Sequence, residues 1–166
     1  VSGKVKFEDF PVTDAGLGAS AMVPVRYAKV QVVRSNGRPE EDFIMADGNT
    51  DAAGKYDITF VNDKPTEPFF YVRVLAQQNS TALKQVVQNL NGDIYAFRTP
   101  KENEPLIDGS MPPADRQGFK VDMEVKKADG AGALNIFDVG VDASLYTWSH
   151  TGRTPPSVTF KWTDGQ

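Results

Sequence analysis

Oxygen-bearing side chains gather in one short part of the chain, in and just before the sequence NTDAAGKYDITF at residues 49–60. Asp47, Asn49 and Asp51 stand at alternate positions, and Asp57 follows in the same stretch. Carboxylate and amide oxygens at this spacing are the ligands that a hard cation takes from a protein loop. One interpretation of the stretch is therefore a calcium site formed by Asp47, Asn49 and Asp51.

The same stretch also fits a tight turn that leads into a β-strand. In this interpretation the Asp51 carboxylate accepts backbone N–H groups, Gly54 takes the positive-φ position, and Tyr56 begins the strand. An EF-hand loop starting at Asp47 needs glycine at its sixth position and glutamate at its twelfth, where this chain has alanine and isoleucine. The sequence excludes an EF-hand and favours the turn, and a looser calcium site stays open as the alternative.

Residues suited to catalysis do not form a familiar active-site pattern. The chain has no cysteine, which excludes thiolate nucleophiles, disulfides and zinc–thiolate sites. Its one histidine, His150, has no G-x-S-x-G sequence to accompany it, which disfavours a Ser-His-Asp triad. Because His150 follows a predicted helix, we expect its imidazole to cap the last carbonyl groups of that helix. We therefore predict that the chain is not an enzyme.

Two further motifs have structural interpretations. Gly130 and Gly132 precede a predicted helix as in a dinucleotide-binding loop, but Asn135 stands where the third glycine would be. These glycines are expected to let the chain turn into the helix, and no cofactor is predicted. Asp138 and Asp142 share one helical face, as a carboxylate pair would. We interpret them as part of a solvated face.

The elements that position these residues have the composition of a soluble globular domain. A chain of 166 residues suits one core, and 40% hydrophobic and 24% charged residues are ordinary values. The net charge of -4, without a large basic patch, predicts no nucleic-acid partner. No apolar run approaches the ~20 residues that a membrane-spanning helix needs, so no membrane span is predicted.

Short alternating segments separated by turn residues predict a mainly β fold. The most hydrophobic segment, residues 69–77, is expected to be a central strand. Residues 13–24 are rich in glycine and alanine, which predicts a flexible excursion, and four prolines predict a long surface loop at residues 100–118. The other expected strands lie at residues 3–9, 27–34, 43–46, 56–60, 83–90, 94–98 and 119–125.

The hydrophobic period changes near the C-terminus. Large apolar residues spaced three, four, four and three apart predict a helix over about residues 133–148. They are Leu134, Phe137, Val141, Leu145 and Trp148. Alternating residues then predict a final strand at about 157–162. We expect all of residues 1–166 to form a single β-sandwich domain.

Four blocks of the first half resemble, in their order, the carboxypeptidase regulatory-like domains, a branch of the transthyretin-like (prealbumin-type) β-sandwiches. The blocks are VSGKVKFED, VPVRYAKVQVV, NTDAAGKYDITF and YVRVLA, within about residues 1–76. The resemblance implies an antiparallel Greek-key β-sandwich, here with one α-helix in the C-terminal half, and a non-catalytic folding, spacing or interaction unit. Residues 133–162 also resemble N-terminal regions of large secreted bacterial proteins, some of which carry metallopeptidase domains.

We therefore expect a non-catalytic extracellular structural or interaction module, such as a subunit or repeat of a surface assembly or filament. Protein partners or further copies would join through strand edges, for which residues 1–10 and 157–162 are the expected segments. The chain begins at Val1 without a signal peptide, so we expect a bacterial or archaeal exported protein or a piece of a longer one.

Two alternatives stay open. One is an accessory N-terminal domain of a secreted hydrolase of metallopeptidase type. The other is a carbohydrate- or ligand-binding module, in which aromatic rings stack on the ligand. Its candidate residues are Tyr95, Phe97, Trp148 and Trp162.

Overall fold

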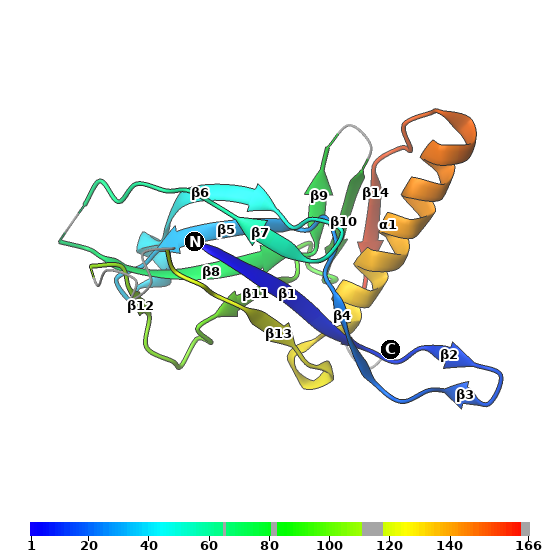
Figure 1. The fold of residues 1–166 in the computed structure, drawn as a ribbon, viewed down its shortest axis with the longest axis horizontal. Helices are drawn as coiled ribbons and strands as arrows, with labels where there is room; N and C mark the ends of the chain where they lie inside the picture. Colours follow the sequence, from blue (N-terminus) through cyan, green and yellow to red (C-terminus); the bar gives the residue numbers. More distant parts are fainter. Residues whose placement is uncertain (65, 81–82, 111–117, 164–166) are drawn as a thin grey trace.

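The structure, a computed structural model, describes residues 1–64, 66–80, 83–110 and 118–163. As predicted, the chain is mainly β with one α-helix, which lies beside the shorter strands at one end of the molecule (Figure 1). Within the described residues the strands form three larger sheets and one small hairpin. One buried apolar cluster takes side chains from the first two sheets, from β10 and from the helix.

The first sheet is built around β1 (Ser2–Asp9). One edge of β1 pairs with β7 (Lys55–Asp57) and β4 (Ala21–Pro24), and the other edge pairs with β13 (Met123–Val125). The pairs with β4 and β7 are antiparallel, whereas the pair with β13 is parallel. β1 is therefore an interior strand, and segments from three distant parts of the sequence meet on it.

The second sheet has five strands, all in antiparallel pairs. As predicted, β8 is central, and its side chains Phe70, Val72 and Val74 are fully buried in the core. The strands are β11 (Ala96–Thr99), β8 (Phe69–Leu75), β5 (Lys29–Arg34), β6 (Phe43–Asn49) and β12 (Ile107–Asp108), with β12 beside one end of β8.

The third sheet places β10 between β9 and β14, and a separate hairpin joins β2 to β3. The predicted final strand is confirmed as β14, and it runs parallel to β10. The bounds are β9 (Gln77–Asn79), β10 (Lys84–Gln88), β14 (Val158–Lys161), β2 (Val12–Thr13) and β3 (Gly16–Leu17); the 3-10 helices are η1 (Pro39–Glu41) and η2 (Lys127–Asp129).

The prediction of a purely antiparallel fold is wrong at two places, the β1–β13 and β10–β14 pairs. Each pair joins strands that are separated by long connections, which parallel pairing requires. An alternating strand has the same side-chain pattern whichever way its neighbour runs, so the sequence pattern cannot distinguish the two directions. The Greek-key arrangement stays a prediction. Residues 21–24, placed in a flexible excursion by the sequence, instead form β4.

Helix α1 (Gly132–Thr151) confirms the predicted helix and extends beyond it at both ends. It follows η2, and Gly130 with φ 90 turns the chain between them, as predicted for this glycine. Gly152, with φ 65, ends the helix in the left-handed conformation that glycine adopts without strain. Within the described residues, no helix combines the length and the apolar character needed to cross a bilayer.

The apolar face of α1 is buried over its first part only. Leu134, Phe137 and Val141 are fully buried, whereas Leu145 is half-buried and Trp148 is 41% exposed. The last turns of α1 lie beyond the end of β14 in Figure 1, so they have no strand beneath them to cover these side chains. The helical period predicted the correct face but not the length over which a sheet covers it.

The backbone of Gly3 on β1 lies close to the carbonyl group of Val121. A substitution at Gly3 therefore tests how β1 packs against this neighbouring segment. A Cβ added at Gly3 would lie 2.0 Å from the carbonyl oxygen of Val121, which also accepts the Tyr56 hydroxyl. We expect Gly3→Ala to lower the free energy of unfolding by about 2–3 kcal/mol, because the backbone must shift to admit the methyl group. Urea denaturation measures this, with Ser2→Ala as the neighbouring control. Equal midpoints for the two variants would contradict the close approach.

Candidate functional site

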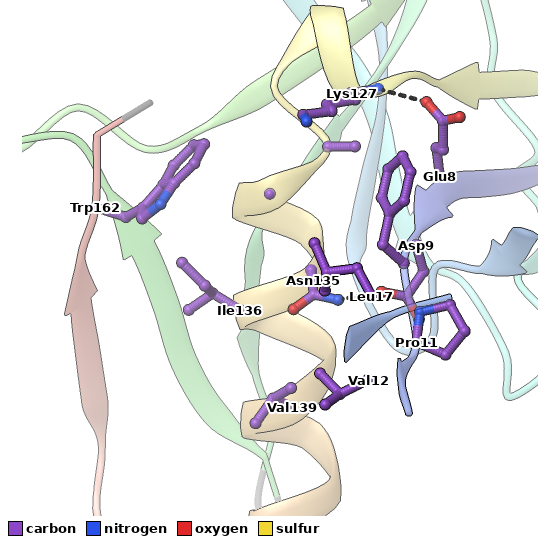
Figure 2. A pocket seen from close by; sticks show the side chains of 13 residues that line it. Glu8, Asp9, Pro11, Val12, Leu17, Lys127, Asn135, Ile136, Val139 and Trp162 are labelled. Carbon is purple, nitrogen blue, oxygen red and sulfur yellow. Dashed lines mark hydrogen bonds between the residues drawn. The ribbon is translucent and has the colours of Figure 1, made fainter. Parts of the chain in front are cut away.

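An open apolar cleft of about 580 Å³ lies between helix α1 and the β2–β3 hairpin (Figure 2). Its walls come from the end of β1, the hairpin, the first turns of α1 and the residue after β14. In Figure 2, Val12 and Leu17 lie on the hairpin side of the helix, and Val139 lies on the helix near Val12. Ile136 projects to the other side of the helix, toward Trp162. Trp162 lines the cleft from the far side of the helix.

The hairpin, which we call the arm (residues 10–19), holds the side chains of Val12 and Leu17 in solvent. Val12 is 85% exposed and Leu17 is 74% exposed, and the two are direct partners across the β2–β3 pair. Direct partners project from the same face of a hairpin, so the arm presents one apolar face. Across the cleft Val139 is 63% exposed. Large apolar side chains gathered in this way around one cleft mark a surface for binding.

Polar residues at the base of the cleft bind one another. The Glu8 carboxylate accepts the backbone N–H of Lys127 at 2.9 Å, and this hydrogen bond holds the pKa of Glu8 below its ordinary value. Asn135 on α1 donates its side-chain amide to the Asp9 carboxylate. The Lys127 ammonium lies 5.4 Å from the centre of the Phe10 ring. These contacts fix the base of the arm against the start of the helix.

Arg26, between β4 and β5, clamps helix α1 from the other side. Its Nε and Nη2 donate to the two carboxylate oxygens of Asp138 at 2.7 Å each, and Nη2 also lies 2.8 Å from Asp142 Oδ1. The hydrogen bonds that Arg26 donates to Asp138 and then to Asp142 raise the pKa of Arg26 above its ordinary value. The interpretation as a solvated face is therefore wrong for Asp138, whose side chain is 21% exposed and binds Arg26. Asp142 also contacts Arg26, but it is 65% exposed as that interpretation requires.

Strand β10 holds the buried face of α1. The side-chain amide of Gln85, itself buried, donates to the backbone carbonyl of Phe137 at 2.7 Å. A Cβ added at Gly140 would lie 2.7 Å from Gln85 Oε1, so the helix approaches the strand closely at this point. With this face fixed to β10, the residues on another side of the helix, Ile136 and Val139, are left to form the cleft wall.

The turn predicted around Asp51 has the expected geometry. Asp51 Oδ1 accepts the backbone N–H groups of Ala53 and Lys55, at 2.8 Å each. Gly54 has φ 72, and Tyr56 lies in β7 with its side chain buried. The Asp51 carboxylate therefore closes this turn, as the turn interpretation requires.

The other two residues of the calcium prediction lie on β6. Asp47 forms an ion pair with Lys29 of β5, with 3.3 Å between Nζ and Oδ2, and Asn49 is the last residue of the strand. Both side chains are exposed. Asp47, Asn49 and Asp51 thus follow one another from the end of β6 into the turn, and the calcium site stays a prediction.

His150 lies at the exposed C-terminal end of α1. Its Nδ1 is 2.9 Å from the carbonyl oxygen of Tyr146, and its ring stacks on the Tyr146 ring at 4.0 Å. His150 therefore caps the helix, as predicted. Ser149 Oγ lies 3.0 Å from the same nitrogen and also donates to the Tyr146 carbonyl at 2.9 Å. A catalytic pair needs a third group to orient the imidazole, and the described contacts of His150 include none.

The four aromatic residues predicted for ligand stacking do not lie together. Tyr95 and Trp162 are in contact, with ring centres 5.2 Å apart and the Tyr95 hydroxyl donating to the Trp162 carbonyl at 3.1 Å. Phe97 belongs to the buried core, and Trp148 lies on the exposed last part of α1. Of the four, Trp162 lines the cleft.

The sequence reasoning missed the arm. Its strands are two residues long, too short for an alternating pattern to show. The available signal was Asp-Ala-Gly between Val12 and Leu17, a turn sequence flanked by apolar residues.

No family model matches the chain, and no curated protein matches it. One similar solved structure is a 9R-lipoxygenase from Cyanothece PCC8801, with 16% sequence identity and a TM-score of 0.37 over 75% of this chain and 16% of that chain. Another is an (S)-allantoin synthase, with 12% identity and a TM-score of 0.32 over 76% of this chain and 41% of that chain. The chain thus spans less than half of either protein, and similarities this low support no argument about its function. The resemblance to carboxypeptidase regulatory-like domains stays a prediction.

The two carboxylates of the helix clamp are expected to differ in their contributions. Asp138→Asn should lower the free energy of unfolding by about 1–3 kcal/mol, because it removes a charge-assisted bidentate hydrogen bond. Asp142→Asn should cost less than about 1 kcal/mol, since that carboxylate is 65% exposed. Urea denaturation of both variants, alone and combined with Arg26→Gln, measures the coupling. Equal effects of the two Asn variants would contradict the bidentate assignment.

The hydrogen bonds that Asp51 accepts in this turn predict that its contribution to the stability of the fold depends on pH. Hydrogen bonds from the Lys55 and Ala53 backbone hold the pKa of Asp51 below its ordinary value. The stabilisation is therefore present above about pH 4 and is lost as pH falls through the lowered pKa. Asp51→Ala should lower the melting temperature at neutral pH, and the difference from the wild type should shrink in acid. Asp14→Ala, on the arm, is the control and should melt as the wild type does.

The same melts with added calcium chloride test the calcium site. A rise in melting temperature that Asp51→Ala abolishes would support the site. An unchanged melting temperature in the wild type would leave the turn as the role of these residues.

Proposed function

We propose that the chain is a non-catalytic structural or interaction module, and that it binds a second copy of itself through the arm and the cleft. The observation that supports this is the exposure of Val12 and Leu17 on one face of the arm, opposite the apolar wall of α1. In this proposal the module is a subunit or repeat of an extracellular surface assembly.

The arm has a physical reason to bind a partner. A two-stranded hairpin alone is marginally stable in water, and the two strands of this arm bury neither Val12 nor Leu17. Burying a side chain such as Val12 or Leu17 contributes roughly 1.5–3 kcal/mol. Association would therefore stabilise the arm and cover the cleft wall in a single step.

A second copy suits the cleft because each chain carries both an apolar projection and an apolar groove. Two chains related by a two-fold axis can each place an arm in the partner's cleft, so that one contact is made twice. The polar groups at the base of the cleft are already paired within the chain, so the arriving surface meets mainly apolar side chains. An arm exchange of this kind would be the centre of a larger interface.

Strand edges offer a second kind of contact for longer assemblies. We do not propose residues 1–10 as the joining strand, because β1 already has partners along both edges within the chain. The C-terminal segment remains suitable, since β14 lies at the outer edge of its sheet. A head-to-tail contact through β14, added to the two-fold contact through the arm, would produce a filament.

The two alternative functions, carbohydrate binding and an accessory domain of a secreted hydrolase, can each be tested separately. Trp162 in the cleft favours carbohydrate binding, because a half-buried aromatic ring that lines a cleft beside polar groups can stack on a sugar ring. A glycan array with no binding would remove this alternative. A zinc-peptidase sequence downstream in the same gene would favour an accessory domain of a secreted hydrolase.

Charged substitutions on the arm test the proposed association. The wild type should form an oligomer in size-exclusion chromatography with light scattering, and a variant carrying Val12→Asp and Leu17→Asp should be monomeric with an unchanged fold. The control is Val61→Asp, because Val61 is 81% exposed and lies outside the cleft. It should keep the oligomer. A wild type that stays monomeric at every concentration would contradict the proposal.

A further inference from the structure

Two arginines stand directly opposite each other on the outer face of the second sheet. Arg73 of β8 and Arg98 of β11 are register partners in an antiparallel pair. Val72 and Val74, on either side of Arg73, point into the core, so Arg73 projects from the opposite face. The Cβ atoms of such partners lie about 4.5–5.5 Å apart, and like charges in this position repel.

Carboxylates do not neutralise this pair within the described residues. Neither Arg73 nor Arg98 takes part in an ion pair there. Two acids lie on β6 or just before it. Asp42 Oδ2 accepts the uncharged Tyr71 hydroxyl at 2.6 Å, while Asp42 Oδ1 is buried without a hydrogen-bond partner among the described residues. Asp47 is paired with Lys29.

Uncharged groups hold both guanidinium groups in place. Arg73 Nε donates to Gln31 Oε1 at 2.6 Å, and Arg98 Nε donates to the Pro100 carbonyl at 3.1 Å. The Arg98 guanidinium also lies 4.2 Å from the centre of the Tyr71 ring. Gln31 is 6% exposed and Tyr71 is 3% exposed, so these supports are packed in place. Each arginine thus uses its Nε for support, which leaves the terminal nitrogens to donate.

Tyr71 stays an uncharged support across the physiological pH range. Burial, together with the hydrogen bond to Asp42, raises the pKa of Tyr71 to about 12. The Tyr71 ring can therefore contact the Arg98 guanidinium without adding a charge beside Arg73 and Arg98.

We propose that Arg73 and Arg98 form a binding site for a doubly charged tetrahedral oxyanion, phosphate or sulfate, on the outer face of the second sheet. Guanidinium forks match the oxygens of such anions, and two forks supply the two positive charges that a doubly charged anion requires. The bound anion removes the repulsion between the two arginines. None of the residues of this site lines the cleft beside α1, so the site does not depend on the proposed association.

Both arginines are half-buried, and Arg98 also lines a cleft of about 310 Å³ between β11 and β13. The carboxylates of Glu102, Glu124 and Asp129 line the same cleft, and Lys101 there is paired with Asp129 at 2.9 Å. An anion is therefore expected to reach the two arginines from the outer face of the sheet and not through this cleft.

Arginine side-chain spectra of the ¹⁵N-labelled full chain test this site. Sodium sulfate and sodium phosphate are titrated at constant ionic strength, with sodium chloride as the background salt, and the Nε–H signals are followed. We expect saturating shifts at Arg73 and Arg98, with either anion. Shifts that do not saturate, or that are equal at all arginines, would overturn the proposal. Saturation by acetate at the same concentrations would also overturn the assignment of a doubly charged anion.

Matched variants show whether both guanidinium groups are needed. Arg98→Gln and Arg73→Gln should each weaken sulfate binding about tenfold or more, since each removes one fork. Arg98→Lys keeps the charge and should also bind more weakly, because an ammonium cannot donate as a fork. Exposed Arg153→Gln removes the same charge elsewhere and should bind as the wild type does. Backbone amide spectra check that each variant is folded, and equal sulfate binding by all variants would overturn the proposal.

Discussion

Backbone hydrogen bonds along both edges of β1 hold this fold together. The Val1 and Val5 carbonyls accept the amides of Ile58 and Val25, and the Val5 amide donates to the Gly54 carbonyl, at 2.8–3.0 Å. On the opposite edge the strand pairs with β13. Val5 and Phe7 are buried between these partners, so the apolar residues of β1 enter the core only when both neighbours are in place.

Helix α1 connects this core to the surface on which function is proposed. Gln85 fixes one face of the helix to β10, and Arg26 fixes another through Asp138 and Asp142. With two faces bound, the third face presents Val139 across the cleft to the arm. The interactions that stabilise the helix therefore also hold the proposed binding surface open. The arginine pair on the second sheet is similar, because buried neighbours orient groups that remain available to a ligand.

Sequence patterns predicted features that depend on neighbouring residues. The period of α1, the hydrophobic run of β8 and the turn closed by Asp51 were all predicted, because local residues determine them. The parallel partners of β1 and β10, and the ion pair of Arg26 with α1, were not predicted. These contacts join positions far apart in the chain, and no local pattern encodes which partner is chosen. The cleft was missed for the same reason, since its walls come from both ends of the sequence.

The pairing of β1 with β13 also constrains how the chain reaches its folded state. Strand β1 cannot complete its pairing until β13, which begins at Met123, has been synthesised. Strand β10 in the same way cannot pair with β14 until residues 158–161 have been synthesised. Contacts of such high sequence separation slow folding, and until they form, β1 and β10 each expose an unpaired edge. A chain that stops short of these late partners would leave two interior strands open. Truncated products should therefore aggregate rather than fold in part.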